Sequence, residues 1–527
     1  MKNINKLLLT ATIFLLVTGC EKVLDQKPQG TQTEENFFLD PSQAILGINA
    51  VYDVASWDEG PGSGHNYEWM YGDVMSEDAE KGSTPGDFPT ITDLKKWNVD
   101  PANSPSGSTY NNMFQGIFRA NTVIKNLSTA TWNPQLKDRI MGEAYFLRGY
   151  YYFYLARLFG GMPLFDAPVL PSQFGTTARA DLGATLKFIE EDFKKAASLL
   201  PEKSAFALSD LGRTTKGAAI AYLGRVIMYQ IGTDNKNNHT WQEVYDITNA
   251  IVNSGQYTLL ANYAQIYEDE GENSSESIFE IQCKASSEGW GPIKSGTTNN
   301  IIQNSRKLWG WGFNNPNTSL GNEFEANDPR KACTMYKDGD IVLGIKQVID
   351  FPNENATGYL NRKAAILKPL EAKASGQNLR KFRYADVLLM KAEAAANTGK
   401  EQEARDLLNQ IRDRARNSTR PKGSVEGTLT YEPSGAPANT LPPVSASVSG
   451  AALKTAIMHE RRVELAEEAL HLWDQIRWGT YLSSLPADVR TKAQARSITG
   501  GVNPVPVLPI PQTEVQSWGL TQNAGYN

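Results

Sequence analysis

The segment Met458–Trp478, MHERRVELAEEALHLWDQIRW, is dense in the residue types that bind metals or transfer protons. Its His459 opens a sequence like HExxH, in which two histidines four positions apart bind zinc, but Val463 stands where the second histidine is needed. Glu468 and His471 form a Glu-x-x-His motif, of which a di-iron helical bundle needs two. The sequence therefore predicts no metal site and no cofactor.

Carboxylates in the same segment suggest a second kind of chemistry, because a pair of carboxylates can hydrolyse a glycoside. Glu464 and Glu468 lie one helical turn apart, but so do Arg461 and Glu464, and Asp474 and Arg477. This spacing on one helix favours ion pairs. The sequence also lacks a nucleophile elbow, a phosphate-binding loop and a GxGxxG turn. We therefore predict a protein that is not an enzyme, with a glycoside hydrolase as a remote alternative.

Aromatic residues in loops are the other candidates for function. They lie in stretches rich in Gly, Asn, Ser and Pro rather than in helical sequence. A flat aromatic ring can stack on the apolar face of a sugar ring, and an exposed aromatic side chain in a loop is a reasonable binding residue. Packing into the local core is the alternative for each of them. The residues are Trp57, Trp69, Trp97, Trp290, Trp309 and Trp311.

The overall composition excludes some classes of protein. The 527 residues are 40% hydrophobic and 21% charged, as in an ordinary globular protein, and the formal net charge is −6. Because no basic footprint is present, we expect no binding of nucleic acid. Cys20, Cys283 and Cys333 are too few for a disulfide framework. We expect Cys283 and Cys333 to be free buried thiols, although a bridge between them stays open.

The N-terminus is typical of a lipoprotein signal peptide. Lys2 and Lys6 precede the apolar run Leu7–Val17, which is too short to span a bilayer. Small residues and then Cys20 follow, as in a bacterial lipoprotein box. We therefore expect cleavage after residue 19 and acylation of Cys20, because two or more acyl chains make a stable membrane anchor.

The most aromatic run of the chain, Glu143–Pro163, predicts the end of one long buried helix. Asn133-Pro134 is a start signal, and Gly160-Gly161 followed by Pro163 is a stop signal. Apolar residues recur at steps of three and four on two faces between these points, so the helix should be buried on two sides. Its charged residues would need partners there; they are Glu143, Arg148 and Arg157.

Other periodic stretches predict further helices over 41–56, 110–127, 179–200, 214–231, 241–253, 382–397, 401–416 and 453–481. The alternation in Ser277–Gln282 predicts a strand. We expect one mainly α-helical domain over 20–527. It divides into helix pairs and loops (20–256), an irregular region with a few short strands (257–380), and C-terminal helices (381–527) with a loop excursion at 417–449.

The pair of predicted helices in Phe382–Arg416 resembles a tetratricopeptide repeat. The helices are joined at Asn397–Gly399, and the small residues Ala392 and Ala404 are twelve positions apart, as in that repeat. Other helix pairs fit more loosely. We therefore predict a divergent scaffold of stacked helix pairs that supports the loop-rich second half.

Several segments in order along the chain resemble one family, the SusD/RagB-like outer-membrane nutrient-uptake lipoproteins of Bacteroidota. These segments are the lipoprotein box at Cys20, Thr33–Phe38 (TEENFF), Glu143–Pro163, Asn273–Ile281 (NSSESIFEI), Phe324–Arg330 (FEANDPR), Glu460–Trp478 and Leu508–Gln512 (LPIPQ). The sequence differs from the family pattern at Glu467–His471, where the family more often has Glu-Gly-x-Arg. The local packing is therefore in question there.

The resemblance implies a fold, a location and a role. The fold is a frame of four tetratricopeptide-like units, and the protein is anchored in the outer membrane and faces the cell exterior. The role is the capture of a nutrient, most often a glycan, for a partner TonB-dependent transporter (SusC-like) that the lipoprotein caps. Binding of a peptide or another nutrient on the same fold is the alternative, as the RagB branch allows.

The resemblance also narrows the list of ligand-binding candidates. Its usual ligand position, in loops of the first hundred residues and the central irregular region, corresponds here to Trp97, Trp290, Tyr67 and Trp69. Trp309 lies where a family motif lies, which favours a structural role. We keep Trp309 as a fifth candidate for ligand binding.

Overall fold

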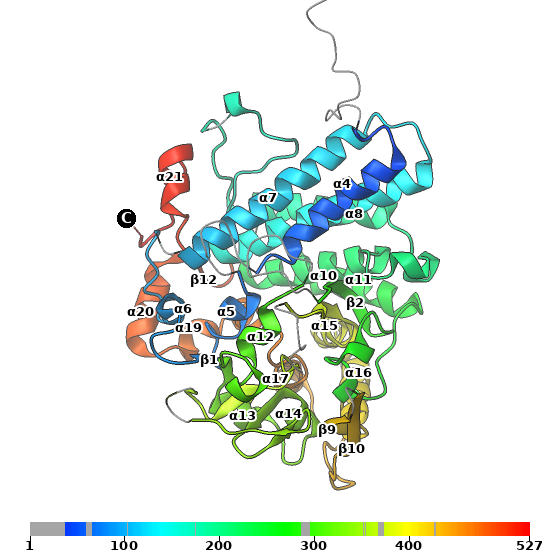
Figure 1. Ribbon diagram of the computed structural model, residues 1–527, viewed down its shortest axis with the longest axis vertical. Coiled ribbons are helices and arrows are strands. Elements are labelled where there is room, and N and C mark those ends of the chain that lie inside the picture. The colour runs from blue at the N-terminus through cyan, green and yellow to red at the C-terminus, as the bar shows by residue number, and fades with distance from the viewer. Residues whose placement is uncertain are drawn as a thin grey trace, which may run out of the picture.

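The computed structural model describes residues 37–58, 66–102, 104–173, 175–234, 236–285, 296–350, 353, 355–366, 374–425 and 428–526. The predicted signal peptide, Cys20 and Trp290 lie outside these residues. The described chain is mainly helical, as predicted. In Figure 1, α4, α7 and α8 lie together at one end of the molecule, and the short helices α13 and α14 lie near the other.

Long helices that follow one another in the chain pack side by side and form the frame (Figure 1). α7 contacts α8, which contacts α9, and contacts continue through α10 and α11 to α15 and α16. The fold class and the helix pairs predicted from the sequence are confirmed. The helices are α4 (Pro41–Ala55), α7 (Ser104–Leu127), α8 (Pro134–Phe159), α9 (Leu182–Leu199), α10 (Lys216–Thr233), α11 (Trp241–Asn253), α15 (Tyr384–Asn397), α16 (Glu401–Arg416) and α17 (Gly450–Glu464).

α8 begins and ends where its sequence signals predict. Asn133 caps it by accepting a hydrogen bond from the backbone N–H of Leu136, and Gly160 ends it with a φ of 79°. Every side chain from residue 146 to residue 159 is buried, so the helix is enclosed on both predicted faces. The buried guanidinium of Arg148 donates hydrogen bonds to both carboxylate oxygens of Asp192, at 2.8 and 2.6 Å.

The predicted tetratricopeptide-like pair is formed by α15 and α16. Ala392 and Ala404 are fully buried in two helices that pack against each other. Gly399 turns the chain between them with a φ of 79°. Small side chains at these positions let the two helix backbones approach closely.

The helix predicted over 110–127 begins earlier than expected. α7 begins at Ser104 because Pro105 fits the first turn of a helix, where its missing N–H is not needed. Short elements also form before it in the chain. They are α5 (Glu68–Gly72), β1 (Ala79–Gly82) and α6 (Pro89–Lys95).

The second half of the chain carries short antiparallel strands in two-stranded sheets, and the strand predicted at Ser277–Gln282 is β2 (Ser277–Ile281). β2 pairs with β8 (Leu379–Arg383), and β1 pairs with β3 (Phe313–Pro316). The excursion at 417–449 contains a hairpin of β9 (Thr419–Val425) and β10 (Thr428–Pro433). The other short elements are α12 (Asn299–Gln303), α13 (Thr318–Glu323), α14 (Pro329–Thr334), β4 (Met335–Lys337), β5 (Ile341–Val342), β6 (Ile345–Lys346) and β7 (Tyr359–Asn361).

The single helix predicted over 453–481 is wrong, because the chain forms α17 and then α18 (His471–Trp478), with a break between them. Within the break, Glu467 and Ala469 have left-handed backbones, with φ of 59° and 58°. This conformation costs a non-glycine residue about 1–3 kcal/mol. The backbone N–H of Ala469 donates to Asp73 Oδ1 at 2.9 Å, which helps to hold the break in place.

The chain ends with short elements that pack near α18 and α8. They are α19 (Tyr481–Ser484), α20 (Ala487–Ala495), β11 (Ser497–Ile498), β12 (Val505–Pro506) and α21 (Gln512–Trp518). In the part of the chain that the structure describes, no helix is both long and apolar enough to cross a bilayer. Cys283 and Cys333 are both free thiols.

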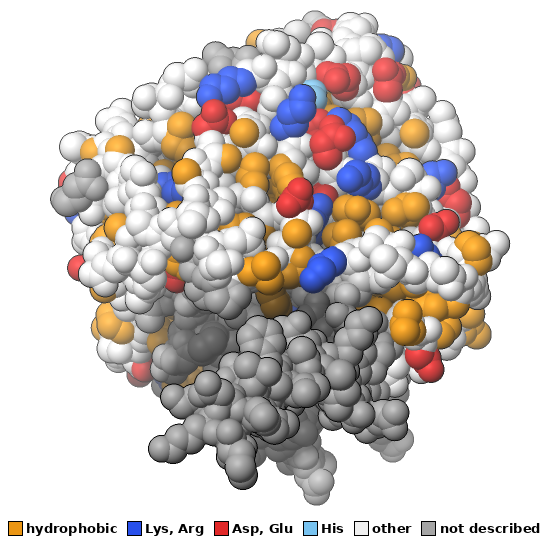
Figure 2. All heavy atoms as spheres, turned by 90° about the horizontal axis from the view of Figure 1, so that it is seen from above, with side chains coloured by type: hydrophobic (Ala, Val, Ile, Leu, Met, Phe, Trp, Pro, Cys, Tyr) orange, Lys and Arg blue, Asp and Glu red, His pale blue; other side chains and the backbone are white. Residues whose placement is uncertain are grey.

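The surface carries charges of both signs. Figure 2 views the molecule from above Figure 1, and on this face acidic and basic side chains lie next to one another among small hydrophobic patches. The described face therefore has no broad field of one sign, in agreement with the expectation from the net charge.

Candidate functional site

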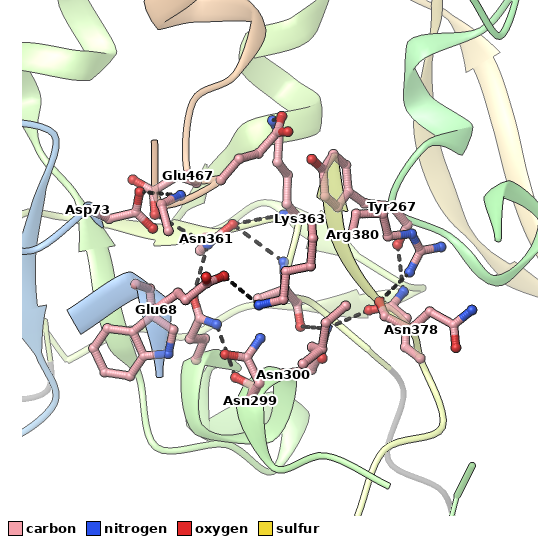
Figure 3. Close-up of a pocket in the computed structure, with 18 residues that line it drawn as sticks. Glu68, Asp73, Tyr267, Asn299, Asn300, Asn361, Lys363, Asn378, Arg380 and Glu467 are labelled. Atoms are coloured by element: carbon pink, nitrogen blue, oxygen red, sulfur yellow. Dashed lines mark hydrogen bonds and ion pairs between the residues drawn. The ribbon is translucent and has the colours of Figure 1, made fainter. Parts of the chain in front are cut away.

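A polar cavity of about 90 Å³ lies where the second half of the chain meets α5 (Figure 3). It is large enough for a few water molecules or a small polar group. In Figure 3, Asp73, Glu467 and Asn361 lie on one side of it, and Arg380 and Asn378 lie on the other. Its walls come from α5 and Asp73, α12, residues 361–364 at the end of β7, residues 377–381 at β8, and the break at Glu467–Ala469.

Two buried amide side chains hold one oxygen of Glu467. Glu467 Oε2 accepts hydrogen bonds from Asn314 Nδ2 at 2.9 Å and from Asn361 Nδ2 at 3.2 Å. The same two amides donate to Gln303 Oε1, at 2.9 and 3.0 Å. Because these residues come from β3, β7 and α12, the fold of the irregular region fixes the position of the carboxyl group.

The carboxyl groups of Asp73 and Glu467 have little positive charge near them to compensate a negative charge. Burial raises the pKa of Asp73 to about 7, and the nearby Asp78 adds to the shift. Burial also raises the pKa of Glu467 well above its ordinary value, as does repulsion from Asp73 and Asp78. Lys363 faces the same corner, but its ammonium group pairs with Glu468 Oε1 at 2.7 Å.

The basic side chains on the walls are paired with other groups. Lys381 forms an ion pair with Glu68, and Arg380 donates to the backbone carbonyl oxygens of Glu268, at 2.6 Å, and Asn378, at 2.8 Å. The cavity is therefore a site of polar and mildly acidic character rather than an anion-binding site.

Five polar atoms of the cavity-lining side chains are buried and have no hydrogen-bond partner among the described residues. They are Trp69 Nε1, Tyr267 Oη, Asn300 Oδ1, Arg380 Nε and Glu467 Oε1. Buried polar groups without partners are uncommon in native structures and require an explanation, such as a bound ligand or water. A hydroxyl group, which both donates and accepts, is suited to such a mixed set of partners.

Two of the predicted aromatic residues lie beside this cavity but are buried. The rings of Tyr67 and Trp69 stack with centroids 5.5 Å apart, and Tyr67 Oη lies 2.7 Å from Thr298 Oγ1. Trp69 lines the cavity, whereas Tyr67 does not. The expectation of exposed rings is therefore wrong for both residues, because they pack against each other and Trp69 also packs against Phe313.

Trp97 is also buried, with only 2% of its surface exposed. Its Nε1 donates to Tyr481 Oη at 2.9 Å, and it does not line the cavity. The expectation that its ring is open for stacking is corrected, because the ring is part of the packing between α6 and α19. Trp309 is 42% exposed and Trp311 is 38% exposed, and neither lines the cavity.

The carboxylates of Met458–Trp478 are mostly members of buried ion pairs. Glu464 contacts Arg330, Arg383 and Arg414 at 3.1, 2.9 and 2.5 Å. His459 contacts Glu323 at 2.6 Å. The interpretation of this segment as a network of ion pairs is confirmed.

Sequence reasoning missed the amide side chains of the cavity. They lie in three places far apart in the chain, and the only local signal is the amide-rich run Asn299–Asn304 (NNIIQN). The amide residues that line the cavity are Asn299, Asn300, Gln303, Asn361, Gln377 and Asn378.

Comparisons with known families cover most of the chain. A sequence profile described as the SusD family matches residues 275–526. A second profile, described as "Starch-binding associating with outer membrane", matches residues 24–228. The predicted resemblance thus extends over both the helical frame and the irregular region.

Individual relatives agree with these matches. The chain is 25% identical over 498 residues to "SusD-like protein P38" of Formosa agariphila, covering 90% of this chain and 91% of the relative. The structure of this chain is similar to that of a "Laminarin binding SusD-like protein", with a TM-score of 0.71 and 27% identity. The match covers 92% of this chain and 99% of the other. The structure is also similar to that of the surface glycan-binding protein A from Bacteroides fluxus, with a TM-score of 0.72, 24% identity and coverage of 92% and 99%.

Proposed function

The chain belongs to the SusD/RagB family, and we propose that it binds an oligosaccharide or polysaccharide at the cell surface and delivers it to a TonB-dependent outer-membrane transporter. The family is not catalytic and takes part in nutrient uptake at the outer membrane, and it includes glycan-binding proteins. The observation that carries the proposal is the family match over 24–228 and 275–526.

The chemistry of the cavity supports a neutral, hydroxyl-rich ligand. Its walls combine six amide side chains with Trp69, and its two lysines are paired with Glu468 and Glu68. Amide groups both donate and accept hydrogen bonds, as sugar hydroxyl groups do. An anionic ligand would be repelled by the negative charge of Asp73.

Laminarin is the first ligand to test, because a structural relative at 27% identity carries laminarin binding in its name. Affinity electrophoresis and calorimetry with laminarin, starch and other soluble glycans test the proposal. We expect binding to at least one glycan. Binding of peptides with no binding to any glycan would contradict the proposal and favour the alternative of a peptide-binding protein.

The exposed aromatic residues provide a second test of the ligand position. If Trp309 stacks on the ligand, Trp309→Ala should weaken glycan binding by roughly 1–3 kcal/mol, by analogy with the stacking of bases on aromatic rings. Trp97→Ala should instead lower the free energy of unfolding by about 3–5 kcal/mol, because its ring is buried. Thermal melts alongside the titrations separate the two effects. Trp290→Ala tests the remaining candidate in the same way.

The proposed anchor and partner have separate tests. Cys20→Ser should abolish the incorporation of labelled fatty acid and release the protein from the membrane fraction, whereas Cys283→Ser should leave both unchanged. The wild-type protein should co-purify with a TonB-dependent transporter from detergent-solubilised outer membranes. Attachment of the Cys20→Ser protein to membranes with an unchanged lipid label would contradict the assignment of the anchor.

A further inference from the structure

We propose that the cavity beside the break between α17 and α18 is a subsite for one hydroxyl group of a neutral sugar, which accepts a hydrogen bond from a carboxylic acid O–H of Glu467. The proposal rests on the proposed glycan-binding function and assigns a specific residue to it. It treats Glu467 as a hydrogen-bond donor rather than as a charged acceptor.

The hydrogen bonds of Glu467 indicate which of its oxygens carries the proton. Oε2 accepts N–H bonds from Asn314 and Asn361, so it is the carbonyl-like oxygen of the acid. Oε1 has no partner within the described part of the chain and belongs to a side chain that is only 8% exposed and lines the cavity. A proton on Oε1 therefore provides a donor for a group within the cavity.

The charged groups around Glu467 favour this neutral form. Asp73, at the end of α5, and Asp78, which precedes β1, repel a negative charge on Glu467. Lys363, which follows β7, attracts it but is paired with Glu468, whose carboxylate also accepts from Arg383. Asp78 is itself paired with Arg462 at 2.7 Å and lies 3.8 Å from His471 Nε2.

Asp73 is the partner that keeps the negative charge when the two acids share one proton. Its Oδ1 accepts the backbone N–H of Ala469, and its Oδ2 accepts from Asn314 Nδ2 at 3.2 Å. Both bonds favour the ionised form of Asp73. Burial holds the pKa of Glu467 well above that of an ordinary glutamate, which favours the protonated donor form.

The other unpaired atoms in the cavity suit the same ligand group. Trp69 Nε1 and Arg380 Nε are donors, Asn300 Oδ1 is an acceptor, and Tyr267 Oη can act as either. A hydroxyl group can accept from a donor such as Glu467 and donate to an acceptor such as Asn300, whereas an ammonium group could only donate. An amine or metal cation would instead require Glu467 to be ionised, so the two kinds of ligand predict opposite dependence on pH.

The test is calorimetric titration, between about pH 5 and about pH 9, of the glycan that the panel identifies as a ligand. For the wild-type protein, we expect the affinity to fall roughly fivefold or more as Glu467 loses its proton, the loss typical of one hydrogen bond. Glu467→Gln keeps a neutral donor at the same position, so its affinity should change little over this range. An affinity that rises with pH in the wild type, or the same pH profile in both proteins, would overturn the proposal.

Asp73→Asn is a second variant, which should shift the pH dependence of glycan affinity rather than abolish it. Without the negative charge of Asp73, Glu467 should lose its proton at lower pH, and the fall in affinity should shift to lower pH. A profile that does not move would show that Glu467 is not the titrating group. Circular dichroism and thermal melts confirm that each variant is folded.

One readout is independent of any ligand and separates this proposal from the proposed function. Infrared difference spectroscopy at neutral pH should show a protonated carboxyl group in the wild type that is missing in Glu467→Gln. If the signal is present but no glycan binds, the glycan-binding function fails and the protonated acid stands. If the signal is absent, the proposal for Glu467 fails, whichever glycan binds.

Discussion

α8 contains the most aromatic run of the chain, and the α17–α18 segment contains a run dense in charged residues. The two segments differ in structure. α8 is an unbroken helix whose aromatic rings are enclosed by other helices, and the hydroxyl group of Tyr151 donates to Val51 O at 2.6 Å. The α17–α18 segment is interrupted at Glu467, where a carboxyl oxygen faces the cavity without a partner among the described residues. Residue type alone does not distinguish the two segments, whereas the interruption of regular structure at Glu467 does.

The largest expected effect comes from breaking the ion pairs of α17. Glu464→Ala should lower the free energy of unfolding by about 3–5 kcal/mol, because it leaves three buried arginines without this carboxylate. Denaturant unfolding measures the change. Glu432→Ala is the matched control, because its pair with Arg420 is half exposed, and it should cost at most about 1 kcal/mol. Equal effects of the two substitutions would remove the distinction between the buried network and the surface.

Substitutions in α8 should destabilise the frame through packing. Tyr151→Ala should lower the free energy of unfolding by about 2–5 kcal/mol, because its side chain is fully buried. Tyr151→Phe removes only the hydrogen bond to Val51 and should cost about 1 kcal/mol. Chemical denaturation of both variants checks this, and glycan affinity should be unchanged in the folded Tyr151→Phe protein. A selective loss of glycan affinity in that variant would place α8 in the site.

Acid should weaken the α17 network before it affects the packing of α8. Although burial opposes it, Arg414, Arg383 and Arg330 hold the pKa of Glu464 at about 2, below its ordinary value of 4.5. The stabilising contribution of this group is therefore complete above pH 4.5 and is lost as the pH falls toward 2. The melting temperatures of the wild type and of Glu464→Gln, measured over this pH range, should become equal at the acidic end. Parallel curves would contradict the assignment.

A smaller effect of opposite sign is expected at the break. Ala469→Gly should raise the free energy of unfolding by about 0.5–1 kcal/mol, because glycine adopts the left-handed backbone without strain. Ala456→Gly, within regular α17, should lower it by a similar amount. Thermal melts compare the two variants. Destabilisation by both would show that the break is not strained at Ala469.

The frame could be predicted from the sequence because its signals are local. The cap at Asn133 and apolar residues at helical spacing place α8 and α11 close to their observed bounds. The exposure of Trp97 could not be predicted, because its burial depends on Tyr481, far away in the chain. Local sequence cannot report which loops pack against one another.

The cavity could not be predicted for two physical reasons. Its amide residues come from segments separated by tens of residues, and only the tertiary fold brings Asn361 into contact with both Gln303 and the carboxyl group of Glu467. The break itself lacks glycine at its two left-handed positions, Glu467 and Ala469, so the periodic pattern continues through it. The departure from the family pattern at Glu467–His471 is the one feature of the sequence that indicates different local packing at the break.

Hydrogen–deuterium exchange with and without the bound glycan tests most directly whether the ligand contacts the cavity rather than the frame. We expect new protection of backbone amides in 298–304, 361–364, 377–381 and 465–470, with no change in peptides from α8. Protection confined to other segments, with these four unchanged, would contradict the assignment of the cavity as the ligand site.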